Sequence, residues 1–269
     1  MSMDLRRVYA IFIRYVYLVR TNAQRLVQIF VWVTFDIILW GFITKYLGGA
    51  DVGNAGFVST LLGSIILWDF LSRAMQGVST PFLEDVWARN LLNIFASPLS
   101  VGEYLAGLVS VSIATSAVGI AVMFALAYVL FGYSILNLGL LLLPFICILF
   151  LTGITLGVLA AAILLRLGPS AEWFIWPLPM ILSPFVGVFY PVTILPQWMQ
   201  LIARVLPPSY VFEGMRAALM TGTFSAAALA AGFALACLYL ALAYVIFVRT
   251  YRQAVRSGAI ARYSAESFS

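Results

Sequence analysis

Histidine is absent from the 269 residues of this chain, and charged residues make up only 9% of it. Without histidine the chain lacks the commonest general base and the commonest metal ligand, which also excludes the usual Ser-His-Asp triad. The sequence contains no GxxxxGK(S/T) phosphate-binding loop, no GxSxG elbow and no His/Cys cluster. We therefore expect a non-catalytic protein that binds no metal and no cofactor of its own.

Lysine and cysteine are also scarce, with Lys45 as the single lysine and only 2 cysteines. The net charge of +5 thus comes from arginine, and most arginines lie in polar segments and at the ends. Such placement is typical of topology signals and lipid headgroup contacts, so nucleic acid is not an expected partner. Cys147 and Cys237 lie far apart inside apolar runs, which predicts small buried core residues rather than a disulfide.

Apolar residues are what the chain has in excess, at 64% of the sequence with a mean hydropathy of +1.05. A soluble globular protein is nearer half apolar and a quarter charged. Because so few polar groups cannot cover this much apolar surface in water, lipid must be the solvent. The composition predicts an all-α integral membrane protein with one transmembrane domain over residues 1–269, surrounded by membrane lipids.

Six apolar stretches are each predicted to cross the membrane, because about 20 helical residues span ~30 Å of hydrocarbon. They are residues 26–46, 56–80, 104–131, 138–165, 173–189 and 224–248. The fifth is short and contains Pro177, Pro179 and Pro184, so kinks are expected in it. An even number of crossings puts both termini on one side. The arginine-rich head and the arginine-rich tail 249–269 identify that side as the cytoplasm.

Residues 1–25 are predicted to form an amphipathic helix in the inner membrane interface. At 100° per residue, its arginines fall within an arc of roughly 140°, and apolar side chains fill the opposite side. These arginines are Arg6, Arg7, Arg14 and Arg20. The helix either only anchors the chain to the lipid surface or also contacts a cytosolic partner, and the sequence leaves both possibilities open.

Residues 81–103 are polar enough to leave the membrane on the cytoplasmic side. Pro81 suits a helix start and Pro98 ends the segment, so a short amphipathic helix is predicted between them. Glu84 and Asp85 are the only adjacent carboxylates of the chain. Neighbouring residues on a helix point apart, which argues against acid–base catalysis by this pair.

Residues 190–219 are too broken by proline, and too polar, to form a simple span. We predict that they form a re-entrant helical pair on the outer side, which dips into the membrane and returns. Irregular backbone at membrane depth is tolerated only where protein or a wet cavity surrounds it. Glu213 and Arg216 lie at i and i+3 in this segment and are expected to pair.

Charges inside the predicted spans need an explanation, because a lone charge in lipid costs a few kcal/mol. Asp36 lies near the middle of the first span, and Asp69 and Arg73 lie at i and i+4 in the second. The two aspartates either relay protons or ions, as in a secondary transporter, or are structural. We favour the structural interpretation, with Asp69 paired to Arg73 and Asp36 to an arginine elsewhere or a wet cavity.

Two motifs carry a family resemblance. FLEDVWARNLLNIFASPLSVGEYLAGLV, residues 82–109, combines an acidic, arginine-containing helix with a Ser-Pro-Leu-Ser turn and a glutamate at the start of a span. FYPVTILPQWMQLIARVLPPSYVFEGMRAAL, residues 189–219, has an aromatic-Pro, a Leu-Pro, a Trp, a Pro pair and a Glu-Gly-x-Arg. Together with the amphipathic head and the six-span plan, they resemble the permease subunits of type-2 ABC exporters over nearly the whole chain.

The resemblance implies a homodimeric pore that works with two copies of a separate ATPase, in a bacterial cytoplasmic (inner) membrane. ATP and Mg would then bind the partner chain only. Residues 84–93 would be a coupling helix that docks into the ATPase, and the head helix would pack along the same partner. The coupling residues would be Glu84, Asp85, Trp87, Arg89 and Asn90. The outer cap would be built around Pro191, Pro196, Trp198, Pro207, Glu213 and Arg216.

The leading hypothesis is therefore an exporter permease for an amphiphilic substrate, such as a lipid, a lipid-linked glycan or a drug-like molecule. Polysaccharide-exporting relatives carry a basic, aromatic approach to the first span with a Gly-Trp pair. RTNAQRLVQIF at 20–30 lacks it, which favours lipids or small amphiphiles. Two alternatives are a proton- or ion-coupled secondary transporter using Asp36 and Asp69, and a scaffold subunit without transport.

Overall fold

The computed structural model describes residues 3–21, 23–49 and 55–258, and the regular structure within them is helical. Residues 50–54, which lie between the first two predicted spans, and the end of the predicted tail, 259–269, lie outside the described residues. The elements are α1 (Leu5–Thr21), α2 (Ala23–Gly49), α3 (Ala55–Trp87), α4 (Leu91–Ala96), α5 (Val101–Phe131), η1 (Ile135–Leu141), α6 (Leu142–Leu167), η2 (Pro169–Ala171), α7 (Glu172–Ile175), α8 (Leu178–Leu182), η3 (Val192–Ile194), α9 (Gln197–Val205), α10 (Pro207–Thr221) and α11 (Ala226–Arg256).

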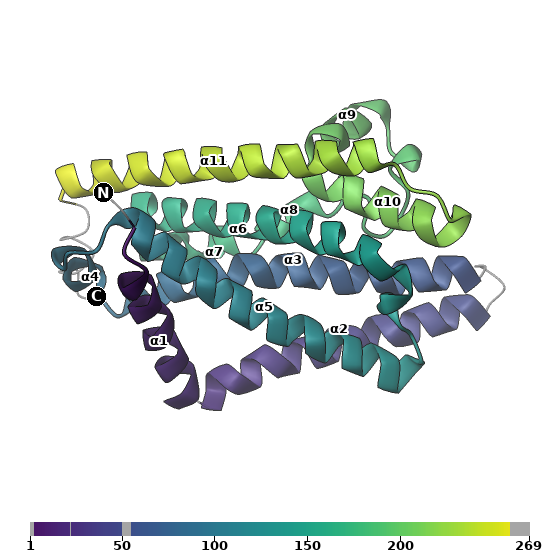
Figure 1. Ribbon diagram of the computed structural model, residues 1–269, viewed down its shortest axis with the longest axis horizontal. Helices are drawn as coiled ribbons and strands as arrows, with labels where there is room; N and C mark the ends of the chain where they lie inside the picture. Colours follow the sequence, from purple (N-terminus) through teal and green to yellow (C-terminus); the bar gives the residue numbers. More distant parts are fainter. Residues whose placement is uncertain (1–2, 22, 50–54, 259–269) are drawn as a thin grey trace.

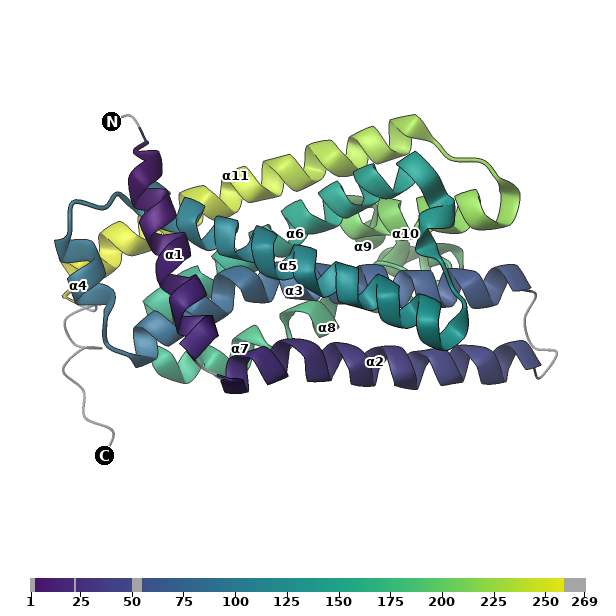
Figure 2. The same ribbon diagram turned by 60° about the horizontal axis from the view of Figure 1, so that its bottom comes forward.

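The long helices α2, α3, α5, α6 and α11 run along the long axis of the molecule (Figure 1). Helix α6 lies at the centre and packs against α3 and α11. Helix α5 packs on α3, and α2 packs on both α3 and α5. Helices α1 and α4 lie at one end, together with the end of α11, and α9 and α10 lie at the other (Figures 1 and 2). We call these the α4 end and the α9–α10 end.

Small residues set the distance between the two central helices. A Cβ at Gly153 of α6 would lie 2.6 Å from the carbonyl oxygen of Leu71, and one at Gly157 would lie 2.7 Å from that of Met75. Both distances are too short for any side chain, so the backbones of α3 and α6 are in direct contact. Small residues allow this close packing in lipid, where van der Waals contact and not water exclusion drives helix association.

The all-α prediction is confirmed for the described residues. Helices α2, α3, α5, α6 and α11 overlap five of the stretches that were predicted to span the membrane. By length and apolarity, three helices of the described residues qualify as membrane spans: Val101–Phe131, Ile135–Leu167 and Ala226–Arg256. The count of six crossings stays a prediction.

The fifth predicted span is not one helix. Its residues form most of α7, then α8 and then a run of turns and bends as far as Phe189. Prolines at 177, 179 and 184 each remove a backbone donor, which breaks the helical ladder repeatedly. The expected kinks are therefore present, and they are severe enough to divide the segment.

Pro81 does not start a helix, contrary to the prediction, because α3 continues through it to Trp87. A proline in a helix interior costs about 3 kcal/mol. The turns beyond it bury Phe82, Leu83 and Val86 almost completely. Each such side chain contributes roughly 1.5–3 kcal/mol on burial, so the packing of three outweighs the proline.

The cysteines also differ from the prediction. Cys147 and Cys237 are free, as expected, but both are exposed on the surface of the chain instead of buried. An apolar run in a membrane protein does not identify a core position, because the lipid-facing side of a span is as apolar as its packed side.

Candidate coupling site

The α4 end brings together α1, the end of α3, the short helix α4 and the start of α5. Helix α1 lies across α5, and a Cβ at Gly107 of α5 would lie 2.6 Å from Cβ of Ile11. The predicted amphipathic head is thus a helix that rests on α5. The structure describes none of its residues as buried, so it also presents a free surface.

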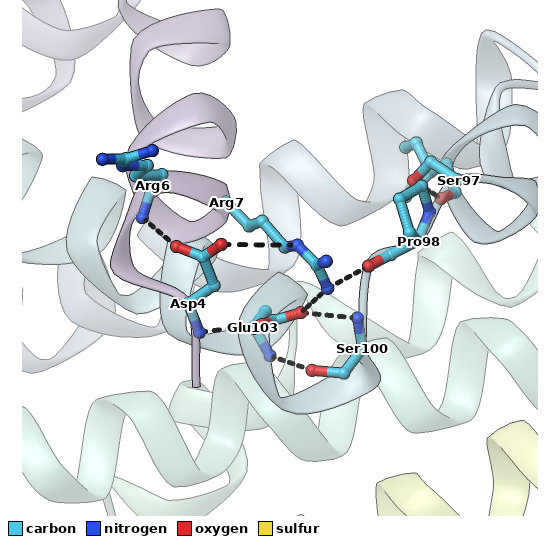
Figure 3. A network of polar contacts seen from close by, with 8 residues as sticks. Asp4, Arg6, Arg7, Ser97, Pro98, Ser100 and Glu103 are labelled. Carbon is cyan, nitrogen blue, oxygen red and sulfur yellow. Dashed lines mark hydrogen bonds and ion pairs between the residues drawn. The ribbon is translucent and has the colours of Figure 1, made fainter. Parts of the chain in front are cut away.

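Glu103 holds the first attachment between α1 and α5 (Figure 3). Ser100 and Glu103 form a capping box at the start of α5, in which the Ser100 backbone N–H donates to Glu103 Oε2 at 2.8 Å. The backbone N–H of Asp4 donates to Glu103 Oε1 at 2.9 Å. Arg7 contacts Glu103 at 3.5 Å and donates to the carbonyl oxygen of Pro98. One carboxylate therefore fixes both the start of α5 and the start of α1.

Asp85, near the end of α3, holds the second attachment, which joins α1 to α3. Arg14 of α1 makes a two-pronged ion pair with it, one bond being 3.2 Å from Nη1 to Oδ2 and the other joining Nη2 to Oδ1. The Tyr104 hydroxyl donates to Asp85 Oδ2 at 2.8 Å. The hydrogen bond with Asp85 raises the pKa of Arg14, so the guanidinium stays charged despite its partial burial.

The sequence suggested that Asp85 contacts a partner protein, but the position of its carboxylate does not favour that role. It is only 2% exposed, and its oxygens are occupied by Arg14 and Tyr104. The physical reason is the continuation of α3 through Pro81, which turns Asp85 toward α1 and α5 and leaves Trp87 outside. Tyr104, which completes the cluster, was not singled out by the sequence.

The predicted coupling helix at 84–93 is also wrong in its limits. Helix α3 ends in a Schellman motif, in which Asn90 N–H donates to the Asp85 carbonyl at 3.0 Å and Arg89 N–H to the Val86 carbonyl at 3.0 Å. Arg89 takes the left-handed conformation, with φ of 55°. Glycine normally occupies this position, so an arginine there gives no warning that the helix stops. The short helix is α4, Leu91–Ala96.

Helix α4 has one packed face and one free face. Leu91 and Ile94 are buried in the core, and the Phe95 ring lies 5.4 Å from Tyr104 and 4.6 Å from Tyr251 of α11. Leu92 and Asn93 of α4 are exposed. Just before α4, Trp87 and Arg89 are also exposed, while Glu84 and Asn90 are half-buried. One large apolar side chain, Leu92, thus projects from α4 and another, Trp87, from the end of α3, while Phe95 holds α4 against α5 and α11.

At the α9–α10 end, Arg216 of α10 joins the broken fifth segment to the helical pair. Its Nη2 contacts Glu213 at 3.2 Å and donates to the carbonyl oxygens of Gly187 and Tyr190, the latter at 3.1 Å. Glu213 in turn accepts the backbone N–H of Val192 at 2.9 Å. The predicted Glu213–Arg216 pair is confirmed, and its role is to hold residues 187–192 in place.

The prolines and Trp198 of the same region have distinct surroundings. Pro207 is buried at the start of α10, Pro191 is half-buried, and Pro196 is exposed just before α9. The indole of Trp198 is exposed and lies edge-on to Phe185 at 6.3 Å. The segment 190–219 is therefore a helical pair as predicted, and its depth in the membrane stays a prediction.

The charged residues of the first two predicted spans, Asp36, Asp69 and Arg73, lie near one another. Asp69 and Arg73 pair at 3.3 Å, as expected. Asp36 lies within electrostatic reach of both, although no ion pair joins it to any described residue. Antiparallel α2 and α3 place 36 and 69 at similar distances from their connection, which explains the proximity. The Asp69–Arg73 pair agrees with the structural interpretation of Asp69.

The described residues include no group of three or more Cys, Asp or Glu side chains that could hold a metal ion. An apolar groove of about 280 Å³ lies between α6 and α11, with Thr155, Pro208 and Tyr239 in its lining. Its surroundings suit an alkyl chain and offer nothing to a phosphate or a nucleotide.

Comparison with protein families decides the identity at the family level. The model of the ABC-2 type transporter family matches residues 13–220, which include every element from α1 to α10 in whole or in part. The chain belongs to the ABC-2 type transporter family. It is thus a multi-pass membrane protein and a permease subunit of a type-2 ABC transporter. A comparison with curated proteins finds no match.

Membership in the ABC-2 type transporter family favours the first hypothesis over ion-coupled transport through Asp36 and Asp69. Members of this family form the membrane component of a transporter and normally pair with an ABC ATPase. In this permease the sequence motif at 97–103 corresponds to the capping box and the α1 attachment. The contacts of Asp4, Phe95 and Tyr251 carried no sequence signal, because each depends on a residue far along the chain.

Proposed function

We propose that two copies of this permease form the path by which an amphiphilic substrate leaves the cell, driven by ATP hydrolysis on a separate ATPase. In this proposal the chain crosses a bacterial inner membrane six times, with both termini in the cytoplasm. The α4 end then faces the ATPase, and the α9–α10 end faces outward. The supporting observation is the exposed apolar surface of Trp87 and Leu92 on an otherwise braced α4 end.

The bracing matters because a coupling element must transmit force without bending. Helix α4 follows α3 after one turn, contacts α5 through Phe95 and Tyr104, and contacts α11 through Phe95 and Tyr251. A push on its free face therefore reaches three of the long helices together. The left-handed Arg89 between α3 and α4 fits this role, since strained backbone conformations concentrate at functional sites.

Helix α1 is attached to the same long helices and can transmit force to them as well. Arg7 joins α1 to the start of α5 and Arg14 joins it to the end of α3, so α1 moves with both helices. Its outward side carries Leu5, Tyr9 and Arg6, all exposed. We favour a dual role in which α1 lies at the lipid surface and also packs along the ATPase.

The dimer would use α2, α7 and α8. These elements expose large apolar side chains, among them Phe35, Phe42, Trp173, Phe174 and Met180. Trp40 of α2 stacks on Phe189 at 5.2 Å, which connects α2 to the segment that follows α8. An apolar path between two copies, together with the apolar groove beside α11, suits an amphiphilic substrate such as a lipid or a drug-like molecule.

Co-purification tests the coupling assignment. The double variant W87A/L92A is expected to lose the ATPase and ATP-driven transport while keeping the wild-type melting temperature, because 47% and 42% of these residues is already exposed. W198A/L201A removes a matching Trp and Leu, exposed by 59% and 60%, at the opposite end. This control should keep the ATPase bound. Equal retention of the ATPase by both variants would refute the docking surface.

A further inference from the structure

The end of α11 carries a cluster of arginines that the coupling mechanism does not use. Arg249, Arg252 and Arg256 are all exposed and, with Gln253 and Ser257, line a hollow of about 490 Å³. None of the three makes an ion pair or a side-chain hydrogen bond with any residue that the structure describes. We call these three the α11 arginine cluster.

Helical geometry puts the α11 arginine cluster on a single face. At 100° per residue the three positions fall within an arc of about 60°. Tyr251 and Ala254 lie on the opposite side, where Tyr251 contacts Phe95 and Ala254 is buried in the core. The last two turns of α11 thus have a packed side against α4 and a uniformly cationic side turned away from the protein.

The length of α11 fixes the level of this cluster in a bilayer. The helix has 31 residues and spans about 46 Å, compared with ~30 Å of hydrocarbon and about 40–45 Å including headgroups. Residues 226–248 are uncharged and account for roughly 34 Å of that length. Because the arginines begin directly after the apolar part, Arg249 lies at the level of the lipid phosphates, and Arg252 and Arg256 follow within about 10 Å along the axis.

A topology signal needs only positive charge on one side of the membrane, wherever it falls. Topology does not require that three arginines share a face, line one hollow and pair with no described acidic group. A guanidinium presents several N–H donors in a fixed plane that matches phosphate oxygens. From the charge, the hollow and the level in the bilayer, we propose that the α11 arginine cluster binds the headgroup of an anionic phospholipid.

The location gives the bound lipid a place beside the coupling element. Tyr251, on the opposite side of the same two turns, is the α11 residue that contacts Phe95 of α4. An occupied site holds the end of α11 at the headgroup layer and so steadies the surface on which α4 rests. This inference goes beyond the proposed export function, since the site requires neither a substrate nor an ATPase.

The test is lipid binding to the full-length chain, measured by native mass spectrometry with dioleoyl phosphatidylglycerol and dioleoyl phosphatidylcholine as probes. We expect the wild type to prefer phosphatidylglycerol. In R249Q/R256Q the affinity for phosphatidylglycerol should fall by about thirtyfold, at a factor of roughly five for each arginine near an anionic surface. R249K/R256K keeps the charge and should retain most of the preference.

The matched control is R20Q/R204Q, which removes two exposed arginines outside the cluster. It should bind phosphatidylglycerol as the wild type does. An equal loss in the control would mean that overall charge governs binding, and an unchanged R249Q/R256Q would mean that there is no site; either result overturns the proposal. The proposal is equally overturned if R249Q/R256Q keeps its lipid but loses a co-expressed ATPase, because the cluster would then be a protein contact.

Discussion

The Arg14–Asp85 attachment predicts an asymmetric response to mutation. Asp85 is 4% exposed at its side chain, whereas the Arg14 side chain is 35% exposed. R14L leaves a buried carboxylate with only the Tyr104 hydroxyl, and an uncompensated buried charge costs about 3–5 kcal/mol. Since solvent already screens part of the pair, we expect about 2–4 kcal/mol. D85N leaves an arginine that can turn into solvent, so its cost should be about 1 kcal/mol.

The free energy of unfolding, measured by SDS titration in mixed micelles, checks both values. The double variant R14L/D85N should be more stable than R14L alone, because it no longer contains an unpaired buried charge. R6L serves as a control, since Arg6 is exposed and its loss should change stability by less than about 0.5 kcal/mol. If D85N destabilises the chain as much as R14L, or if the double variant shows no recovery, the assignment of a buried carboxylate dependent on Arg14 is wrong.

Three further predictions concern the α9–α10 end and the topology. R216M should cost about 2–3 kcal/mol of unfolding free energy, because the carbonyls of Gly187 and Tyr190 and the Glu213 carboxylate all lose their donor, whereas R204M on the exposed end of α9 should be nearly neutral. G187A should cost about 1–2 kcal/mol in the same titration, because φ is 72° and the added Cβ would lie 2.9 Å from Val192 Cγ2; G222A, with φ of 67° and open space around it, separates the backbone cost from the clash. A cysteine at exposed Gln197 in a background lacking Cys147 and Cys237 should react with an impermeant maleimide from outside intact cells and one at exposed Asn93 only after lysis, and the reverse pattern would refute the topology.

The sequence located the long helices because a run of about 20 apolar residues has few alternatives in a chain this hydrophobic. Ion pairs within one helix could also be predicted. The pairs Asp69–Arg73 and Glu213–Arg216 follow from the spacing of neighbours on a helix. In each case a contact within a few residues decides the outcome. The amphipathic pattern of α1 was recognisable for the same reason.

The limits of the coupling segment were not predictable from the same kind of evidence. Pro81 is a local signal for a helix start. The burial of Phe82 and Val86 against distant helices stabilises the continued helix by more than the proline costs. Arg89 ends α3 in a conformation that normally indicates glycine. Asp85 looked like a surface carboxylate beside Glu84, and only the position of α1 shows that it is buried.

The core of a membrane protein presents a related difficulty. Cys147 and Cys237 lie in apolar runs and are nonetheless exposed, since nothing in a uniformly apolar helix separates its lipid side from its protein side. The spacing of glycines in α6 is a clearer signal, although no prediction was based on it. Gly153 and Gly157 lie four residues apart, and both meet the backbone of α3.

The contact between Asp4 and Glu103 is made by the main chain of Asp4, not by its side chain. Substitutions at position 4 other than proline therefore leave this donor in place. They would still remove the Asp4 carboxylate, which accepts the Arg6 backbone N–H at 2.9 Å and lies 3.8 Å from Arg7. Chain length is a different matter, because Arg7 and Arg14 must meet their partners with the same helical register. Removing a single residue between Asp4 and Arg7 would rotate one attachment by about 100° relative to the others. The contact between Asp4 and Glu103 therefore tolerates a change of side chain at position 4 better than a change in the number of residues before Arg7.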